Sequence, residues 1–275
     1  MTPQQREALA HLEARIEDYL EKSQRGEPAV SCFLTPGERK QADRYLARRG
    51  MGKRCCFWGG YAEAERTCLI VLPPYYEELM DWMPEDSDMN VTPFLEDVGE
   101  DGVAAVRVIG SGYRALNHRD YLGSLLGLGL ERDALGDIAV QNDFEAVVFC
   151  KRRMVGFLTE TLQKAASDTV RCVEYRVEED ESFTDGRRYR PLSDTVASAR
   201  LDCIVAALTN LSREDAQGLV RSGLVEVDFE TEERVDKILT APATVSARGY
   251  GRFILRSFDG ETKKGRLRLR ADQLI

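Results

Sequence analysis

The segment 200–253 constrains the fold more than any other part of this 275-residue chain. Apolar residues recur at helical spacing in two short stretches, and Ser212 at their junction is suited to cap the second helix. Gly223 can take the left-handed conformation that ends a helix, and residues 224–227 alternate as a strand. We therefore predict two helices, a glycine turn and a strand, with Ser193 capping the first helix.

Arginines and lysines gather at the joints of this segment and along the strands expected after it. Such side chains bind phosphates, and helix N-termini offer them free N–H groups. We therefore predict RNA-backbone contacts from Arg200, Arg213, Arg221, Arg248, Arg252, Lys263, Lys264, Arg266 and Arg268. Arg132 is a further candidate, because we expect it to project from a glycine-rich turn together with Asp133 and Asp137. A purely structural turn explains Arg132 equally well.

The charge of the chain is unevenly distributed. The net charge is −9, which by itself argues against nucleic acid as a partner. Residues 200–275 carry +1, however, while the remainder carries −10, and residues 248–275 alone carry +5. Ordinary solvated surface charge would explain these net charges on their own. The basic carboxy-terminal residues favour RNA as a partner only in combination with the two predicted helices.

The elements expected along the chain indicate an α+β, multi-domain protein. We predict an amino-terminal α+β region (1–78), a middle domain (79–180), an acidic and basic linker (181–194) and the basic carboxy-terminal module (195–275). In the amino-terminal region, Thr35 followed by Pro36 and Glu38 marks a helix start. Two strands are expected at 54–58 and 67–72, and a short helix at 75–83.

The middle domain has a regular order of elements. Strands are predicted at 104–109, 136–140, 145–151 and 169–177, and helices at 118–126 and 155–165. This is the ferredoxin-like order found in RNA-recognition modules, which stack bases on the free face of their sheet. The aromatic signature of those modules is missing, so we expect Phe149 to be a core residue.

Several functional classes lack support in the sequence. Seven cysteines, no C-x-x-C pair and two histidines predict reduced thiols in the cytoplasm, with no disulfide scaffold, zinc site or cofactor. The ten acidic residues of segment 77–101 indicate a solvated connection rather than a metal site. No apolar stretch is long enough for a membrane helix, and no catalytic or phosphate-loop motif is found. We therefore expect no enzyme activity, membrane contact or small-molecule substrate.

Two sets of residues resemble known families. The carboxy-terminal pattern Arg200-Leu201-Asp202, Ser212-Arg213, Ala216, Ser222-Gly223 and Val225-x-Val227 resembles the S-four RNA-binding domain. It departs from that family in two turns, at Asp228-Phe229 and Ala241-Pro242. The segment 117–138, which contains Asn-His-Arg-Asp and Gly-Leu-Gly-Leu, is similar to the YlmH family of bacterial ribosome-associated proteins.

The YlmH resemblance implies binding to RNA on the large ribosomal subunit, with tRNA as a further candidate partner, and a role in rescue or quality control of stalled translation. Our first hypothesis is therefore a non-catalytic RNA-binding factor. Two alternatives remain. One is an RNA-modifying enzyme of the pseudouridine-synthase type, because S-four domains often accompany such enzymes. The other is a protein adaptor linked to cell division, motivated by the acidic body of the chain.

Overall fold

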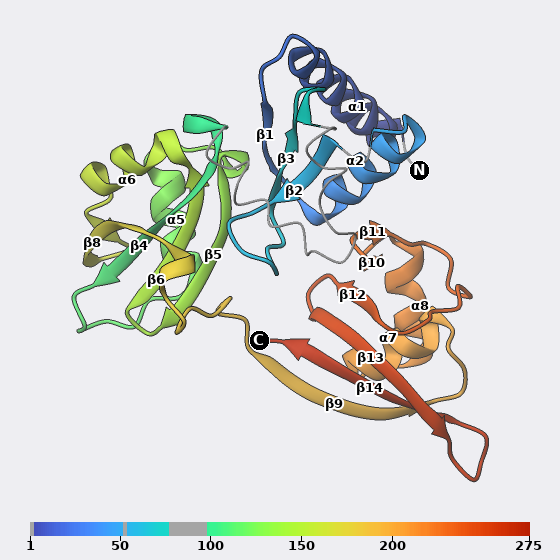
Figure 1. Ribbon diagram of the computed structural model, residues 1–275. Coiled ribbons are helices and arrows are strands. Elements are labelled where there is room, and N and C mark those ends of the chain that lie inside the picture. The colour runs from blue at the N-terminus through green and yellow to red at the C-terminus, as the bar shows by residue number, and fades with distance from the viewer. Residues whose placement is uncertain (1–2, 52–53, 77–97) are drawn as a thin grey trace. The chain divides into compact units, whose positions relative to one another are not determined.

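The computed structural model describes residues 3–51, 54–76 and 98–275 (Figure 1). It divides into two compact units, Met1–Gly186 and Arg187–Ile275, and its mixture of helices and sheets confirms a multi-domain protein of mixed α and β structure. Residues 77–83 of the expected short helix 75–83 and most of the acidic segment 77–101 lie outside the described residues. No helix in the described part of the chain has the length and apolar character needed to cross a membrane.

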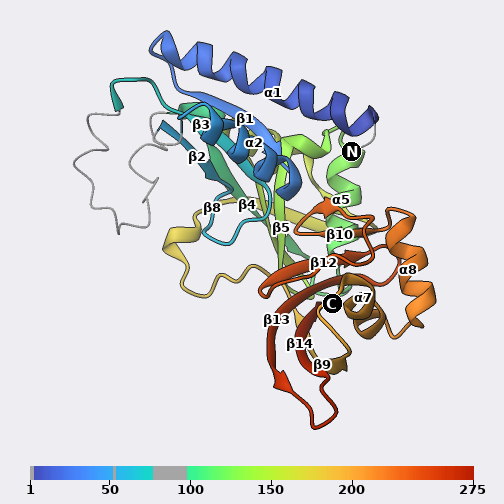
Figure 2. The same cartoon turned by 90° about the vertical axis from the view of Figure 1, so that its right-hand side faces the viewer.

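The amino-terminal region is a three-stranded sheet with helices on one face (Figures 1 and 2). The strands β1 (Ala29–Leu34), β2 (Cys55–Trp58) and β3 (Thr67–Val71) pair in the order β1-β3-β2, and the helices are α1 (Pro3–Gln24) and α2 (Pro36–Arg48). The predicted start of α2 is confirmed, since Thr35 and Glu38 form a reciprocal capping box. Strand β1 is an element that the sequence patterns do not predict.

The middle of the chain forms an antiparallel sheet of order β5-β6-β4-β8-β7. Its strands are β4 (Val103–Gly110), β5 (Leu135–Asn142), β6 (Glu145–Lys151), β7 (Lys164–Ala165) and β8 (Asp168–Tyr175). The helices α5 (His118–Gly127) and α6 (Val155–Thr161) pack on one face. Helix α6 ends earlier than predicted, because β7 follows it at once and pairs with β8.

The opposite face of this sheet is covered around Phe149, which corrects the expectation of a free face. The ring of Phe149 is fully buried and packs 4.9 Å from the ring of Tyr61 and 6.0 Å from that of Phe183, measured between centroids. Phe33 of β1 belongs to the same buried cluster. Phe149 is therefore a core residue, as predicted, packed against Tyr61 and Phe33 of the amino-terminal region and against Phe183, which follows β8.

A carboxylate fastens the amino-terminal region to the middle sheet. Asp137 accepts a hydrogen bond from the hydroxyl of Tyr61 at 2.7 Å and from the backbone N–H groups of Glu65 and Arg66 at 2.8 and 3.1 Å. The prediction that Asp137 projects into solvent from a turn is therefore wrong. It lies instead on the sheet face that the amino-terminal region covers, where these three donors satisfy it.

The carboxy-terminal unit has a six-stranded sheet of order β11-β10-β12-β13-β14-β9. Its elements are β9 (Tyr189–Val196), α7 (Leu201–Thr209), α8 (Arg213–Arg221), β10 (Val225–Val227), β11 (Glu230–Thr231), β12 (Ala243–Ala247), β13 (Gly251–Glu261) and β14 (Leu267–Leu274). Both helices pack on one face of the sheet, around a core that contains Ile204, Val220 and Phe253 (Figure 1).

Two predictions near the start of this unit are wrong. Residues 189–194, predicted as part of a linker, belong to the edge strand β9, whose partner β14 lies at the far end of the chain. Ser193 is part of that strand and does not cap α7, which begins after Arg200. Exposed polar residues and Pro191 are not typical of a strand, so the sequence pattern does not predict one here. An edge strand tolerates both.

Candidate nucleic-acid interface

The first turns of α7 and α8 meet at a corner built around Asp202. This side chain is fully buried, although it carries a carboxylate. It accepts hydrogen bonds from Arg200 Nε at 3.1 Å, from Arg213 Nε at 3.0 Å and from Gln217 Nε2 at 2.7 Å. One carboxylate therefore ties together a residue before α7 and two residues of α8.

The ionised state of Asp202 is strongly favoured. Burial on its own would raise its pKa, but the hydrogen bonds from Arg200, Gln217 and Arg213 outweigh burial and hold the pKa well below its ordinary value. The side chains of Arg200 and Arg213 remain 33% and 55% exposed. Asp202 thus fixes the two guanidinium groups in position while leaving part of each open to solvent.

Helix α8 extends this corner as a line of polar side chains. Arg213, Gln217 and Arg221 are spaced four residues apart, so they lie on one side of the helix. Arg221 Nη2 donates to Gln217 Oε1 at 3.3 Å. We call Arg200, Arg213, Gln217 and Arg221 the arginine corner. The structure brings together three of the predicted RNA-binding residues here.

The start of α7 does not offer free N–H groups to a phosphate, which corrects our expectation. The backbone N–H of Leu201 donates to the carbonyl oxygen of Lys237 at 2.8 Å, and that of Asp202 donates to Val235 at 3.0 Å. Glu232 holds this connecting segment through Lys237 Nζ at 2.9 Å and Arg234 Nε at 3.1 Å. Burial opposes ionisation of Glu232, yet these partners lower its pKa to about 2.

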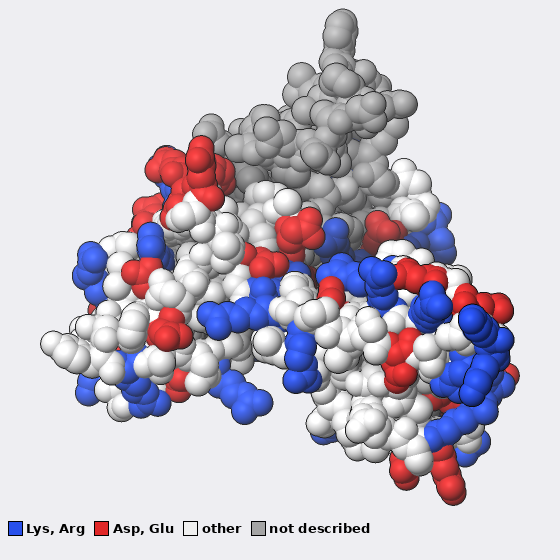
Figure 3. All heavy atoms as spheres, turned by 90° about the horizontal axis from the view of Figure 1, so that it is seen from below, with Lys and Arg blue, Asp and Glu red and all other residues white. Residues whose placement is uncertain are grey.

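The remaining predicted residues of this unit lie in other places. Arg248 is exposed in the turn before β13, and Lys263 and Lys264 are exposed in the turn before β14. Arg266 in that second turn donates from Nε to Thr195 Oγ1 at 3.0 Å. Figure 3 shows the basic side chains in separate groups, interleaved with acidic ones.

Arg252 and Arg268 belong to the sheet face turned away from the helices. Each precedes a buried residue, Phe253 or Leu269, that points into the core, and successive side chains of a strand point to opposite faces. The guanidinium carbon of Arg252 lies 5.1 Å from the ring centroid of Phe229. The nine basic residues predicted in this unit therefore do not form one surface.

Arg132 is turned inward rather than projecting from its turn. Its Nη1 donates to the carbonyl oxygens of Leu135 and Gly136 at 2.9 and 3.1 Å. Burial and the nearby charge of Arg66 lower its pKa to about 10. Of the two interpretations of this turn, the geometry favours the structural one, because the guanidinium group braces the chain that enters β5.

Sequence reasoning missed Asp202 and Gln217 as site residues. Asp202 belongs to the Arg-Leu-Asp pattern, but its burial depends on the packing of α8, which begins eleven residues after it. Gln217 carries a usable signal, since it lies four residues after Arg213 and four before Arg221.

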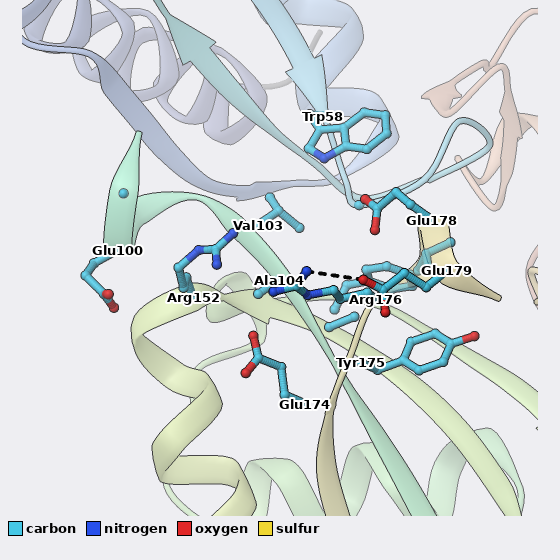
Figure 4. A pocket seen from close by; sticks show the side chains of 15 residues that line it. Trp58, Glu100, Val103, Ala104, Arg152, Glu174, Tyr175, Arg176, Glu178 and Glu179 are labelled. Atoms are coloured by element: carbon cyan, nitrogen blue, oxygen red, sulfur yellow. Dashed lines mark hydrogen bonds and ion pairs between the residues drawn. The ribbon is translucent and has the colours of Figure 1, made fainter. Parts of the chain in front are cut away.

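A cavity of about 510 Å³ lies in the first unit beside β4 and β8 (Figure 4). Trp58 and Tyr175 contribute aromatic surface, and four glutamates and two arginines line it: Glu100, Glu174, Glu178, Glu179, Arg152 and Arg176. Arg176 pairs with Glu179 at 3.2 Å. The excess of carboxylates makes this cavity unsuited to a phosphate. Within the described residues, no group of three or more histidine, cysteine or acidic side chains could hold a metal ion.

Comparison with known proteins finds a family model and a relative that resemble this chain. Residues 109–179 match the family model "Putative RNA-binding domain in YlmH". A protein of Bacillus subtilis (strain 168), named ribosome-associated protein quality control protein P2, is 29% identical over 240 residues, which cover 87% of this chain and 85% of the relative. The resemblance to the YlmH family is confirmed.

A solved structure with the same family name was also found. The cell division protein ylmH from Streptococcus pneumoniae matches with a TM-score of 0.47 and 19% sequence identity, over 65% of this chain and 95% of that chain. The YlmH family model falls within the middle sheet and its helices, whereas the arginine corner lies outside the matched residues.

Proposed function

We propose that this chain is a non-catalytic RNA-binding factor that binds ribosomal RNA of the large subunit and acts in rescue or quality control of stalled translation, with tRNA as a further candidate partner. Two findings support an RNA-binding role on the ribosome: the family model named for RNA binding and the relative named for ribosome-associated quality control. The arginine corner supplies a second surface for RNA in the other unit.

The architecture supports the finer assignments within this proposal. The strands β5-β6-β4-β8, with α5 and α6 on one face, have the order and antiparallel pairing of a ferredoxin-like domain. The two short helices of the other unit, followed by β10 and the sheet, agree with an S-four-type domain. We propose both assignments.

One observation carries the proposal furthest: the buried carboxylate of Asp202 holds Arg200 and Arg213 side by side. Binding to a rigid phosphate backbone is favoured when the cations are already in place, because less side-chain entropy is lost on binding. Arginine also presents several donors in a fixed plane, which suits phosphate oxygens. The corner is thus a preorganised phosphate-binding surface.

The proposal is tested by sedimentation of cell extract on a gradient. The wild-type protein is compared with a variant in which Arg200, Arg213 and Lys264 are changed to Ala. We expect the wild type to migrate with large ribosomal subunits and the variant to move towards the top of the gradient. A matched control changes the exposed residues Lys22, Arg25 and Arg176 to Ala, which removes the same charge from the other unit.

The same variants are then compared in RNA binding with purified components. Each lost phosphate contact should flatten the plot of log affinity against log salt concentration by about one unit. The triple variant should therefore lose about two to three units of slope, and the matched control should keep the wild-type slope. Wild-type affinity and slope in the Arg200, Arg213 and Lys264 variant would overturn the proposal.

A further inference from the structure

The middle domain needs a different RNA-contacting surface from the one that its fold suggests. RNA-recognition modules stack bases on aromatic side chains of the open sheet face. Here the corresponding region around Phe149 is buried under Tyr61 and Phe183. The family model named for RNA binding nevertheless covers residues 109–179 of this same domain. If that domain contacts RNA, as the proposed function holds, another part of its surface must do so.

Tyr113 is the most exposed large apolar side chain among the described residues. It is 96% exposed, and it lies in the connection between β4 and α5, inside the matched segment. A single exposed aromatic ring is common on protein surfaces, so it is the position of Tyr113 inside the segment matched by the RNA-binding family model that singles it out. Tyr113 is therefore a candidate for stacking against a planar ligand.

The connection that carries Tyr113 is braced rather than loose. Ser111 donates to Asp168 from its backbone N–H at 3.0 Å and from its hydroxyl at 2.5 Å, and the N–H of Tyr113 donates to Ser111 Oγ at 3.3 Å. Farther along, the buried Leu116 donates its N–H to Asp143 at 2.7 Å. Both ends are thus fixed to the domain, so the ring is presented on a preorganised turn.

Basic side chains lie on the connection that carries this ring and on the elements next to it. Arg114 follows it directly, contacts Ser167 and lies 3.6 Å from Asp120. Arg119 is exposed in the first turn of α5, and Lys164 is exposed in the β7–β8 hairpin to which Ser167 belongs. Of the nearby acids, Asp168 is 8% exposed and bound to Ser111, Asp120 pairs with Arg114, and Asp143 is exposed in the turn between β5 and β6. The elements that adjoin the ring therefore present Arg114, Arg119 and Lys164 together with one exposed carboxylate.

We infer that Tyr113 stacks on an unpaired RNA base while Arg114 and Arg119 contact the phosphates beside it. An aromatic platform with neighbouring cations is the arrangement by which proteins hold single-stranded nucleic acid, because every base has a face to stack and every linkage a negative charge. The ligand is a single-stranded or looped RNA segment. A continuous duplex does not suit the site, since its bases are already stacked on one another.

The test compares Tyr113→Ala and Tyr113→Trp with the wild type on two probes, a 12-nucleotide single-stranded RNA and a 12-base-pair RNA duplex. Stacking on one base is worth roughly 1–3 kcal/mol, so Tyr113→Ala should weaken single-strand binding about 5- to 150-fold. Duplex affinity should stay within about twofold, and Tyr113→Trp should retain wild-type affinity for both probes. The salt slope for the single strand should not change, because stacking releases no counterions.

A matched control is Phe157→Ala on α6, which removes another exposed aromatic ring from the same domain and should leave single-strand affinity unchanged. Equal affinity of Tyr113→Ala and wild type for the single strand would overturn the inference, as would an equal loss on both probes or no single-strand binding by the wild type. The Arg200, Arg213 and Lys264 variant tests the proposed function separately. If that variant loses affinity and Tyr113→Ala does not, only the present inference fails.

Discussion

A carboxylate that is fully buried and still ionised needs several donors, and Asp202 receives them from Arg200, Arg213 and Gln217. The two arginines gain a fixed position in return. Removing the carboxylate would leave partly exposed guanidinium groups that water can solvate, so the main loss would be their placement. Asp202 therefore links the stability of the corner to the RNA binding that we propose for it.

We predict that Asp202→Asn lowers the free energy of unfolding by about 1–3 kcal/mol at pH 7, the usual effect of losing hydrogen bonds to a buried charged group. The pKa of Asp202 is lowered on folding, so its contribution is complete above the pKa of the unfolded chain, about 3.9, and is lost as the pH falls below that value. The difference between variant and wild type should therefore shrink from pH 7 to pH 3 in chemical denaturation.

The exposed Asp194 of β9 offers a control for this measurement, because Asp194→Asn removes a carboxylate from the same unit without removing a hydrogen bond of the corner. We expect its effect to lie within about 0.5 kcal/mol of zero at both pH values. A loss in Asp202→Asn that is equal at pH 7 and pH 3 would contradict the role assigned to its ionised form.

Local capping signals can be predicted at single residues, whereas partners brought by tertiary packing cannot. Ser212 is predicted as the cap of α8, and it accepts from the N–H of Asp215 at 3.1 Å. Arg132 is expected to project because the glycines around it indicate a turn. Nothing in its neighbours along the chain shows that two carbonyl groups of β5 face it.

At the scale of elements, the connection between β2 and β3 is fitted closely to β6. Gly60 has a φ of +102°, and a Cβ atom there would lie 2.2 Å from Cδ1 of Phe149. A side chain at this position would thus meet both a strained backbone and an aromatic ring that is fully buried. The close approach lets Tyr61 reach its place over Phe149.

We predict that Gly60→Ala lowers the free energy of unfolding by about 2–4 kcal/mol, which combines overpacking of about 1–3 kcal/mol with left-handed strain of about 1 kcal/mol. Equilibrium unfolding in urea measures the change. Gly26→Ala isolates the backbone contribution, because Gly26 has a φ of +92° and a Cβ atom added there would have no neighbour within 4 Å. Equal losses in the two variants would show that Phe149 does not restrict position 60.

Elements with strong local patterns are predicted more accurately than those defined by distant partners. Strand β6 occupies the predicted residues 145–151, because its apolar run is long and a turn precedes it. Strand β1 lies between two strong helices and escapes prediction. Strand β9 resembles a linker in the sequence. Its pairing with β14, which joins Val196 to Leu267, cannot be predicted from neighbouring residues, because the two strands lie far apart along the chain.

At the scale of the whole molecule, each unit has a core of its own. The buried cluster of the carboxy-terminal unit draws on both helices and on β9, β10, β12, β13 and β14. Among the described residues of the first unit, one cluster lies within the amino-terminal region and one within the middle sheet and its helices, while the cluster around Phe149 draws on both. The predicted boundary between residues 1–78 and 79–180 therefore separates regions that share a buried core.

We predict that residues 187–275, produced alone, fold and unfold in one cooperative transition and keep the salt-dependent RNA binding of the arginine corner. Circular dichroism during thermal unfolding and the salt slope of RNA binding measure the two properties. The same fragment with Arg200 and Arg213 changed to Ala is the control for binding. A fragment that folds but binds RNA without salt dependence would place the phosphate contacts elsewhere.

The covered face of the middle sheet also bears on how the sequences of related proteins can diverge. In a domain of this shape the aromatic sheet face is either open to a ligand or covered by a neighbouring region of the same chain. Here it is covered, because Phe149 packs under Tyr61 and Phe183. When the face is covered, a substitution on one side of this contact requires a compensating substitution on the other. Aligned homologues should therefore show positions 60, 61 and 149 changing in concert, with a residue larger than glycine at position 60 only where position 149 has become smaller.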